Sequence, residues 1–277
     1  MSAPSTLSQR DGKTLRVDEL RVGFGGVVAL DRISMSATQG EIVGVIGPNG
    51  AGKTTLFNVI CGFVRADSGV ITYDGSSLLE HHHAHDLTEL GIARTLQGVG
   101  LFAGMSVLEN VMIGAQSGLR SDFGSAMLGL WRSSREERHL ASRAGELLEE
   151  LGVSAYARHF PATLPYSIQK RTALARALIA QPSLLLLDEP ASGLSNDEMA
   201  ELGTLIQGLS SRMSVLLVEH HMDLVMSVCD RIVVLNFGQV IADGTPESVQ
   251  SNPEVATAYL GDEVHDSVTT PGTSENA

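Results

Sequence analysis

The segment Gly47–Thr55 constrains the fold of this chain more than any other part of the sequence. It has the sequence Gly-Pro-Asn-Gly-Ala-Gly-Lys-Thr-Thr and directly follows the apolar run 41–46. The spacing fits the pattern G-x-x-x-x-G-K-[ST], in which a buried strand leads into a glycine-rich turn and then a helix. Small residues let the backbone approach a phosphate closely, and a helix from Thr55 to about Val64 directs its N–H groups to the same point. The segment therefore predicts an α/β fold with a nucleoside triphosphate site.

Every residue of this segment is a candidate for nucleotide binding. The Lys53 ammonium would reach the β- and γ-phosphates, and the Thr54 hydroxyl would bind the Mg²⁺ that accompanies the nucleotide. The alternative is a glycine-rich turn that merely precedes a helix, which the complete spacing and the strand in front disfavour. The candidates are Gly47, Pro48, Asn49, Gly50, Ala51, Gly52, Lys53, Thr54 and Thr55.

Charge and composition narrow the class of protein. The formal net charge of −13 over 277 residues disfavours nucleic-acid binding, which requires a basic face. Cys61 and Cys229 lie in apolar segments, which predicts buried, reduced thiols. The first 13 residues contain no apolar segment, and no stretch approaches the ~18 apolar residues of a membrane span. We therefore expect a cytoplasmic protein with a sizeable core.

The hydrophobic pattern divides the chain into regions. Short alternating runs in 15–37 and 67–75 predict antiparallel strands, and helical periods from about 107 to 151 predict a helical insert. Apolar runs separated by helical stretches then predict buried parallel strands. These runs lie at 183–188, 214–219 and 231–235. The polar ends, 1–13 and 262–277, are predicted to be disordered.

Two carboxylates end the most apolar of these runs. Asp188 and Glu189 would lie at the carboxyl edge of the parallel sheet, where such sheets bind ligands. Taken alone, Asp-Glu after a strand is often the start of an ordinary loop. With a phosphate loop upstream, Asp188 becomes the candidate that holds Mg²⁺ through water, and Glu189 the candidate general base that polarises the attacking water.

Four motifs, in this order, resemble the ATP-binding subunits of ABC transporters. They are Gly47–Thr55, Arg94–Gln97, Leu184–Pro190 and Val218–His220. The resemblance covers roughly residues 14–261. It implies an ATPase with a P-loop α/β core, an antiparallel β subdomain and a helical subdomain at about 98–165. ATP and Mg²⁺ are the cofactors implied.

The resemblance also implies roles for single residues. Gln97 matches the glutamine that contacts Mg²⁺ and the attacking water, and His220 matches the histidine that hydrogen-bonds the γ-phosphate. Phe24 is the best match to the aromatic residue that stacks on adenine, although an aromatic at a strand end is as often part of the core. The implied Mg²⁺ ligands are Thr54, Gln97 and Asp188.

Longer phrases resemble the ATPases of branched-chain-amino-acid importers and their relatives for urea and amides. They include IGPNGAGKTTLFNVICGF, MSVLENV, VEHHMDLVM and DGTPESVQSNPEVATAYLG. The resemblance implies a peripheral protein at the cytoplasmic face of the membrane. Its partners would be permease subunits seated near 97–111, a second ABC ATPase and, indirectly, a solute-binding protein. The alternative is an ATP-binding regulatory ABC module with little hydrolysis and no role in transport.

The family's signature, Leu-Ser-Gly-Gly-Gln, falls on Leu164–Ile168, where only the leucine matches. In the family, this segment contacts the γ-phosphate of the nucleotide held by the opposite subunit. Pro165 has no N–H to donate, and Tyr166 and Ile168 add bulk. Ser195 also stands where the broad family has aspartate in the dimer-contact loop. We therefore expect a heterodimer with a second ATPase whose signature is intact.

Two further segments attract attention but carry no assigned site. The histidines at 81–83 and 85 lie in a polar stretch, and we expect a solvated loop with no structural metal. The segment 123–131 is apolar, and it would either face the membrane or a permease or pack on the core.

Overall fold

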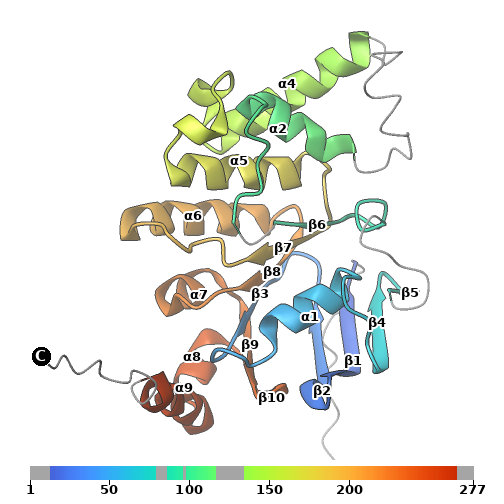
Figure 1. Cartoon of the computed structure of the whole chain (residues 1–277), viewed down its shortest axis with the longest axis vertical. Coiled ribbons are helices and arrows are strands. Elements are labelled where there is room, and N and C mark those ends of the chain that lie inside the picture. The colour runs from blue at the N-terminus through green and yellow to red at the C-terminus, as the bar shows by residue number, and fades with distance from the viewer. Residues whose placement is uncertain (1–12, 79–85, 96–97, 117–133, 267–277) are drawn as a thin grey trace, which may run out of the picture.

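The computed structural model describes residues 13–78, 86–95, 98–116 and 134–266, and its first sheet is antiparallel (Figure 1). In spatial order its strands are β2 (Val27–Ala37), β1 (Leu15–Phe24), β4 (Ser68–Tyr73) and β5 (Ser76–Ser77). Alternation along β1 buries Leu15 and Val17 while the residue between them is exposed. The antiparallel strands predicted in 15–37 and 67–75 are confirmed.

The second sheet is mainly parallel and carries the predicted apolar runs. Its spatial order is β10 (Gln239–Gly244), β9 (Arg231–Asn236), β3 (Ile42–Ile46), β8 (Ser214–Val218), β7 (Leu184–Asp188) and β6 (Ile92–Arg94). The three strands predicted from these runs are confirmed as β7, β8 and β9. Leu185 and Leu187 face one hydrophobic cluster while Leu184 and Leu186 face the other, so β7 is buried on both sides.

Helices cover both faces of this sheet. They are α1 (Lys53–Ile60), α2 (Val107–Ile113), α4 (Ser134–Glu150), α5 (Tyr166–Leu178), α6 (Asn196–Leu209), α7 (Met222–Val228), α8 (Pro246–Gln250) and α9 (Pro253–Asp266), with short 3₁₀ turns at Gly114–Gln116, Ser154–Tyr156 and Pro161–Thr163. Helix α1 packs between the two sheets, with Phe57 fully buried (Figure 1). On the other face of this sheet, α5, α6 and α7 bury apolar residues in the hydrophobic cluster that contains Leu185 and Leu187.

Helix α1 is displaced from its predicted bounds. It begins at Lys53, two residues before Thr55, and ends at Ile60 rather than near Val64. Gly62 takes a left-handed φ of 70°, and the Phe63 N–H donates to the Asn58 carbonyl. This glycine cap ends the helix before Val64. The apolar residues continue past Ile60, so the hydrophobic pattern did not indicate the end of the helix.

Helices α2, α4 and α5 pack together in the upper part of Figure 1. α2 and α4 lie within the range of about 107–151 where helical periods predicted an insert. The buried Asn110 side chain holds the preceding loop by accepting from the Phe102 amide at 2.7 Å and donating to the carbonyls of Phe102, Met105 and Ser106. The loop 102–106 is therefore fixed to α2.

Helix α9 runs from Pro253 to Asp266, the last of the described residues. Several predictions fall outside the described residues: the disorder of 1–12 and 267–277, the histidines at 81–83 and 85, and the apolar segment 123–131. Both cysteines are buried and free, and burial raises the pKa of Cys61 to about 11 and that of Cys229 to about 12.

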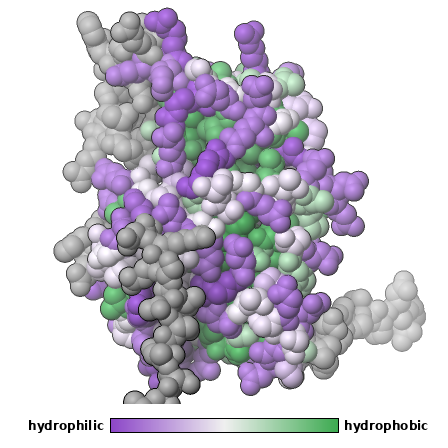
Figure 2. All heavy atoms as spheres, turned by 180° about the vertical axis from the view of Figure 1, so that it is seen from behind, coloured by the Kyte–Doolittle hydropathy of each residue, from purple (hydrophilic) through white to green (hydrophobic). Residues whose placement is uncertain are grey.

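The surface is mainly hydrophilic on the face shown in Figure 2, where green areas are interrupted by purple side chains. Within the described residues, no helix combines the length and the apolar character that crossing a membrane requires.

Candidate active site

Three neighbouring parallel strands bring the predicted residues to one edge of the large sheet. The strand order β3, β8, β7 places their carboxyl ends side by side, with Val218 in register with both Val45 and Asp188. The phosphate loop, Glu189 and Glu219 each follow directly after one of these strands. The sequence-predicted grouping of the phosphate loop with the Asp-Glu pair at this edge is confirmed.

The phosphate loop requires glycine where it touches the sheets. Gly47 has φ 149°, and a Cβ there would lie 2.1 Å from the Leu235 carbonyl oxygen. Gly52 has φ 105°, and its Cβ would lie 2.7 Å from the Ala29 carbonyl oxygen. No side chain fits at either position, so the backbone of the loop is held between β2 and β9.

The loop also holds a positive charge. The Lys53 ammonium donates to the carbonyls of Gly47 at 2.5 Å and Pro48 at 2.8 Å, which keeps its charge inside the loop. Gly52 precedes α1, whose start has no side-chain cap, and the amino end of a helix favours an anion. Thr54 is exposed in this first turn. The loop suits phosphate groups in both charge and shape.

Asp188 is an almost fully buried acid with a built-in counterion. Its side chain is 3% exposed, and its carboxylate accepts from the Arg94 guanidinium at 2.7 Å. The same guanidinium donates to the Asn58 side chain on α1 at 2.9 Å and lies over the rings of Phe57 and Phe63. Carboxylate and hydroxyl oxygens are ligands that Mg²⁺ prefers, so Asp188 together with Thr54 fits the predicted metal.

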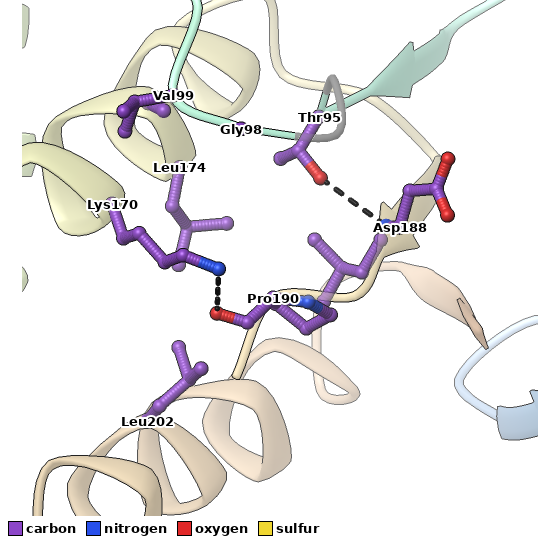
Figure 3. Close-up of a pocket in the computed structure, with 10 residues that line it drawn as sticks. Thr95, Gly98, Val99, Lys170, Leu174, Asp188, Pro190 and Leu202 are labelled. Atoms are coloured by element: carbon purple, nitrogen blue, oxygen red, sulfur yellow. Dashed lines mark hydrogen bonds between the residues drawn. The ribbon is translucent and has the colours of Figure 1, made fainter. Parts of the chain in front are cut away.

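The loop after β7 carries Glu189 in a left-handed conformation, with φ 47°. Its amide donates to the Val218 carbonyl at 2.9 Å. The Lys170 ammonium on α5 donates to the Glu189 carbonyl at 3.0 Å and to the Pro190 carbonyl at 2.8 Å, and Figure 3 shows the second of these bonds. Figure 3 also shows the hydrogen bond from the Asp188 amide to the Thr95 hydroxyl. Contacts from β8, α5 and the end of β6 therefore fix this loop.

Glu219 joins two loops of the site. It is fully buried, and it accepts from the backbone amides of Ala191, His220 and His221 and from the His221 ring. Burial raises the pKa of this carboxyl, but the four hydrogen bonds outweigh burial, so the pKa lies below its ordinary value. The neighbouring His220 side chain is half exposed at the sheet edge.

The remaining predicted residues are Phe24, which lies at the end of β1, and Gln97, which lies outside the residues that the structure describes. Phe24 is 51% exposed at the end of β1, and its register partner is Val27, two residues from the Ala29 that touches Gly52. It is therefore no part of the core. Gln97 lies outside the described residues, and its role stays a prediction.

The segment Leu164–Ile168 forms the start of α5. Pro165 is the N-cap residue, and Tyr166 begins the helix with an exposed ring. The side chains of Leu164 and Ile168 pack against the core. The exposed part of this segment is therefore Pro165 and Tyr166.

The family model for ABC transporters matches residues 30–192, which is more than half of the chain. The chain belongs to the ABC transporter family of ATP-binding proteins. A second model, for branched-chain amino acid ATP-binding cassette transporters, matches residues 239–265 of this ABC ATPase.

Similar proteins and structures agree with this family. The chain is 39% identical to the high-affinity branched-chain amino acid transport ATP-binding protein BraF of Pseudomonas aeruginosa, over 90% of this chain and 98% of BraF. It is 40% identical to LivG of Salmonella typhimurium, with the same coverage. The ADP conformation of MJ1267, an ATP-binding cassette of an ABC transporter, superposes with a TM-score of 0.79 at 31% identity, covering 90% of this chain and 99% of that one.

Sequence reasoning missed Arg94, Lys170 and Glu219. Arg94 and Glu219 lie inside motifs that were recognised, but a motif does not reveal that a side chain is buried. Lys170 follows the altered signature segment, and its hydrogen bonds to a loop 19 residues away carry no local signal. The signal that could have revealed these three residues is a charged side chain within or next to a recognised motif.

Glu219 makes the stability of this ABC ATPase depend on pH. Because its folded-state pKa is depressed, its stabilisation is fully present above the ordinary carboxyl value near 4.3 and is lost as pH falls through the folded pKa. We expect Glu219→Gln to lower the free energy of unfolding by about 1–3 kcal/mol at pH 7, since the amide NH₂ cannot accept these bonds. The deficit should shrink below about pH 4.

Urea unfolding at pH 7 and in steps below pH 4.3 measures this difference, with Glu89→Gln as an exposed control. An equal deficit at every pH would contradict the assignment.

Proposed function

We propose that this ABC ATPase drives the uptake of branched-chain or related amino acids through a membrane permease, at the cytoplasmic face of the membrane. The observation that carries the proposal is the convergence of the phosphate loop, Asp188, Glu189 and His220 on one sheet edge. The similarity to BraF and LivG over nearly the whole chain supports the transported class.

In this proposal each residue of the edge has a separate task. The amides of the phosphate loop and Lys53 bind the β- and γ-phosphates, and Phe24 supports the adenine. Thr54, Gln97 and Asp188 would hold Mg²⁺, which neutralises phosphate charge when bound. Glu189 polarises the attacking water, and His220 donates to the γ-phosphate.

The phosphate role of Lys53 is tested by Lys53→Ala. Removing a charge-assisted contact should weaken Mg-ATP binding by about 2–4 kcal/mol. Lys13→Ala, on the antiparallel side of the molecule, is the control. Glu189→Gln should instead retain ATP, since binding is kept and hydrolysis is lost. Titration with Mg-ATP measures both, and unchanged affinity in Lys53→Ala would overturn the assignment.

The loop 101–107 is the proposed seat of a permease loop. Phe102 and Met105 expose apolar surface here, and Asn110 fixes the backbone beneath them. Phe102→Asp should abolish solute uptake in cells and leave basal ATP hydrolysis within about twofold, because an unpaired carboxylate opposes an apolar contact. Val70→Asp, an exposed position on β4, is the control. Normal uptake with Phe102→Asp would refute this contact.

The altered signature segment supports pairing with a second ATPase, each nucleotide lying between one phosphate loop and the partner's signature. The site built on Lys53 and Glu189 would be the faster, and the partner's nucleotide, covered by Pro165 and Tyr166, would mainly stay bound. We expect the chain alone to hydrolyse ATP weakly. In the assembled transporter, Glu189→Gln should remove most activity, and the equivalent change in the partner much less.

Rapid hydrolysis by the isolated chain, or loss of activity only with the partner's change, would contradict this asymmetry. The altered segment is also compatible with the regulatory module, which the transport relatives do not favour. Co-purification from membranes, with identification of the accompanying chains, separates the two: permease subunits and a solute-binding protein support transport.

A further inference from the structure

The first two turns of α5 are fastened to the segment that follows β7. The Tyr166 ring lies against Gly193, where an added Cβ would meet it at 3.1 Å. The Ser167 hydroxyl helps to lower the pKa of the Glu198 carboxyl, and Arg171 forms an ion pair with Glu201. The face of α5 that carries the altered signature segment therefore contacts its own chain along this stretch.

Lys170 makes the contact nearest to the chemistry. Its half-buried ammonium donates to the carbonyls of Glu189 and Pro190, and it lies 5.3 Å from the centre of the Tyr166 ring. In Figure 3 the side chain extends from α5 toward Pro190 beside a small cavity, with Leu202 below it. Burial lowers the pKa of Lys170, and the charges of Glu219 and Glu189 oppose that effect.

The peptide that Lys170 holds determines where the Glu189 side chain leaves the backbone. The backbone of Glu189 is in the left-handed region. Residues other than glycine adopt this conformation mainly where the surrounding structure imposes it. Its carbonyl accepts from Lys170 and from the Ser192 amide, and its own amide is held by Val218.

We propose that Lys170 is a positioning residue for Glu189, and that it links the segment facing the partner's nucleotide to the chain's own water-polarising carboxylate. Tyr166 and Lys170 stand one helical turn apart on α5, so a shift of the segment at the nucleotide of the partner moves the ammonium that holds the Glu189 peptide. This inference rests on the proposed role of Glu189.

The test compares Lys170→Met with Arg171→Met in the full chain, purified with the subunits that accompany it. Both variants replace a long cation on the same helix, but Arg171 contacts α6 rather than the Glu189 loop. We expect Lys170→Met to lower kcat about tenfold with KM for Mg-ATP changed less than twofold, because the water-polarising group is misplaced while binding is kept. Lys170→Arg, which keeps a donor, should recover most of the loss.

Amide hydrogen exchange supplies a readout that needs no turnover. In Lys170→Met the amides of Glu189 and of residues 191–195, Ser192 above all, should exchange at least several-fold faster than in Arg171→Met. Equal kcat, or equal exchange, in the two variants would overturn the inference.

Glu189→Gln, assayed in parallel, separates this inference from the proposed function. If Glu189→Gln retains full hydrolysis, the role of Glu189 fails. If it abolishes hydrolysis while Lys170→Met has normal kcat, the positioning role alone fails.

Discussion

Buried negative charge at one sheet edge is the constraint on which the rest of this structure depends. Asp188 is almost inaccessible to water, and a carboxylate without a partner there would cost several kcal/mol. Arg94 supplies the partner and at the same time bonds Asn58 on the helix that follows the phosphate loop. The ion pair therefore sets the distance between the two halves of the nucleotide site, and breaking it by removing one partner typically costs about 3–5 kcal/mol.

Glu219 meets the same constraint mainly through backbone amides. Backbone amides from the loop after β7 and from its own loop surround the carboxylate, so its charge is stabilised by dipoles already fixed by the fold. The consequence is geometric: Ala191 and His220 are joined through one side chain. The loop that carries Glu189 and the loop that carries His220 are thereby parts of a single rigid edge.

Close packing of the backbone explains why the sequence revealed the phosphate loop so clearly. Glycine is required at positions 47 and 52 because the carbonyls of Leu235 and Ala29 occupy the space that a side chain would need. Such a requirement fixes the spacing of the glycines, which can be recognised in the sequence. The apolar runs predicted the parallel strands for a similar reason, since residues buried on both faces must be continuously hydrophobic.

Other features of the fold show no comparable pattern in the sequence. β6 has three residues and β10 is half polar, so neither shows a strand pattern. The early end of α1 depends on one glycine cap, and the length of α9 on a segment without strong periodicity. Arg94, Lys170 and Glu219 act across long sequence separations, and the partners of a buried charge are chosen by the fold rather than by neighbours in the chain.

The start of α5 shows how these constraints act on one short segment. Pro165 offers no N–H and Ile168 is turned into the core, so the segment presents little to a nucleotide on a partner subunit. On the intramolecular side the same turns make polar contacts through Lys170 and Arg171. The two sides of the segment therefore differ in what they contact. The inner side holds the loop of Glu189 through Lys170, and the outer side presents Pro165 and the exposed Tyr166 ring.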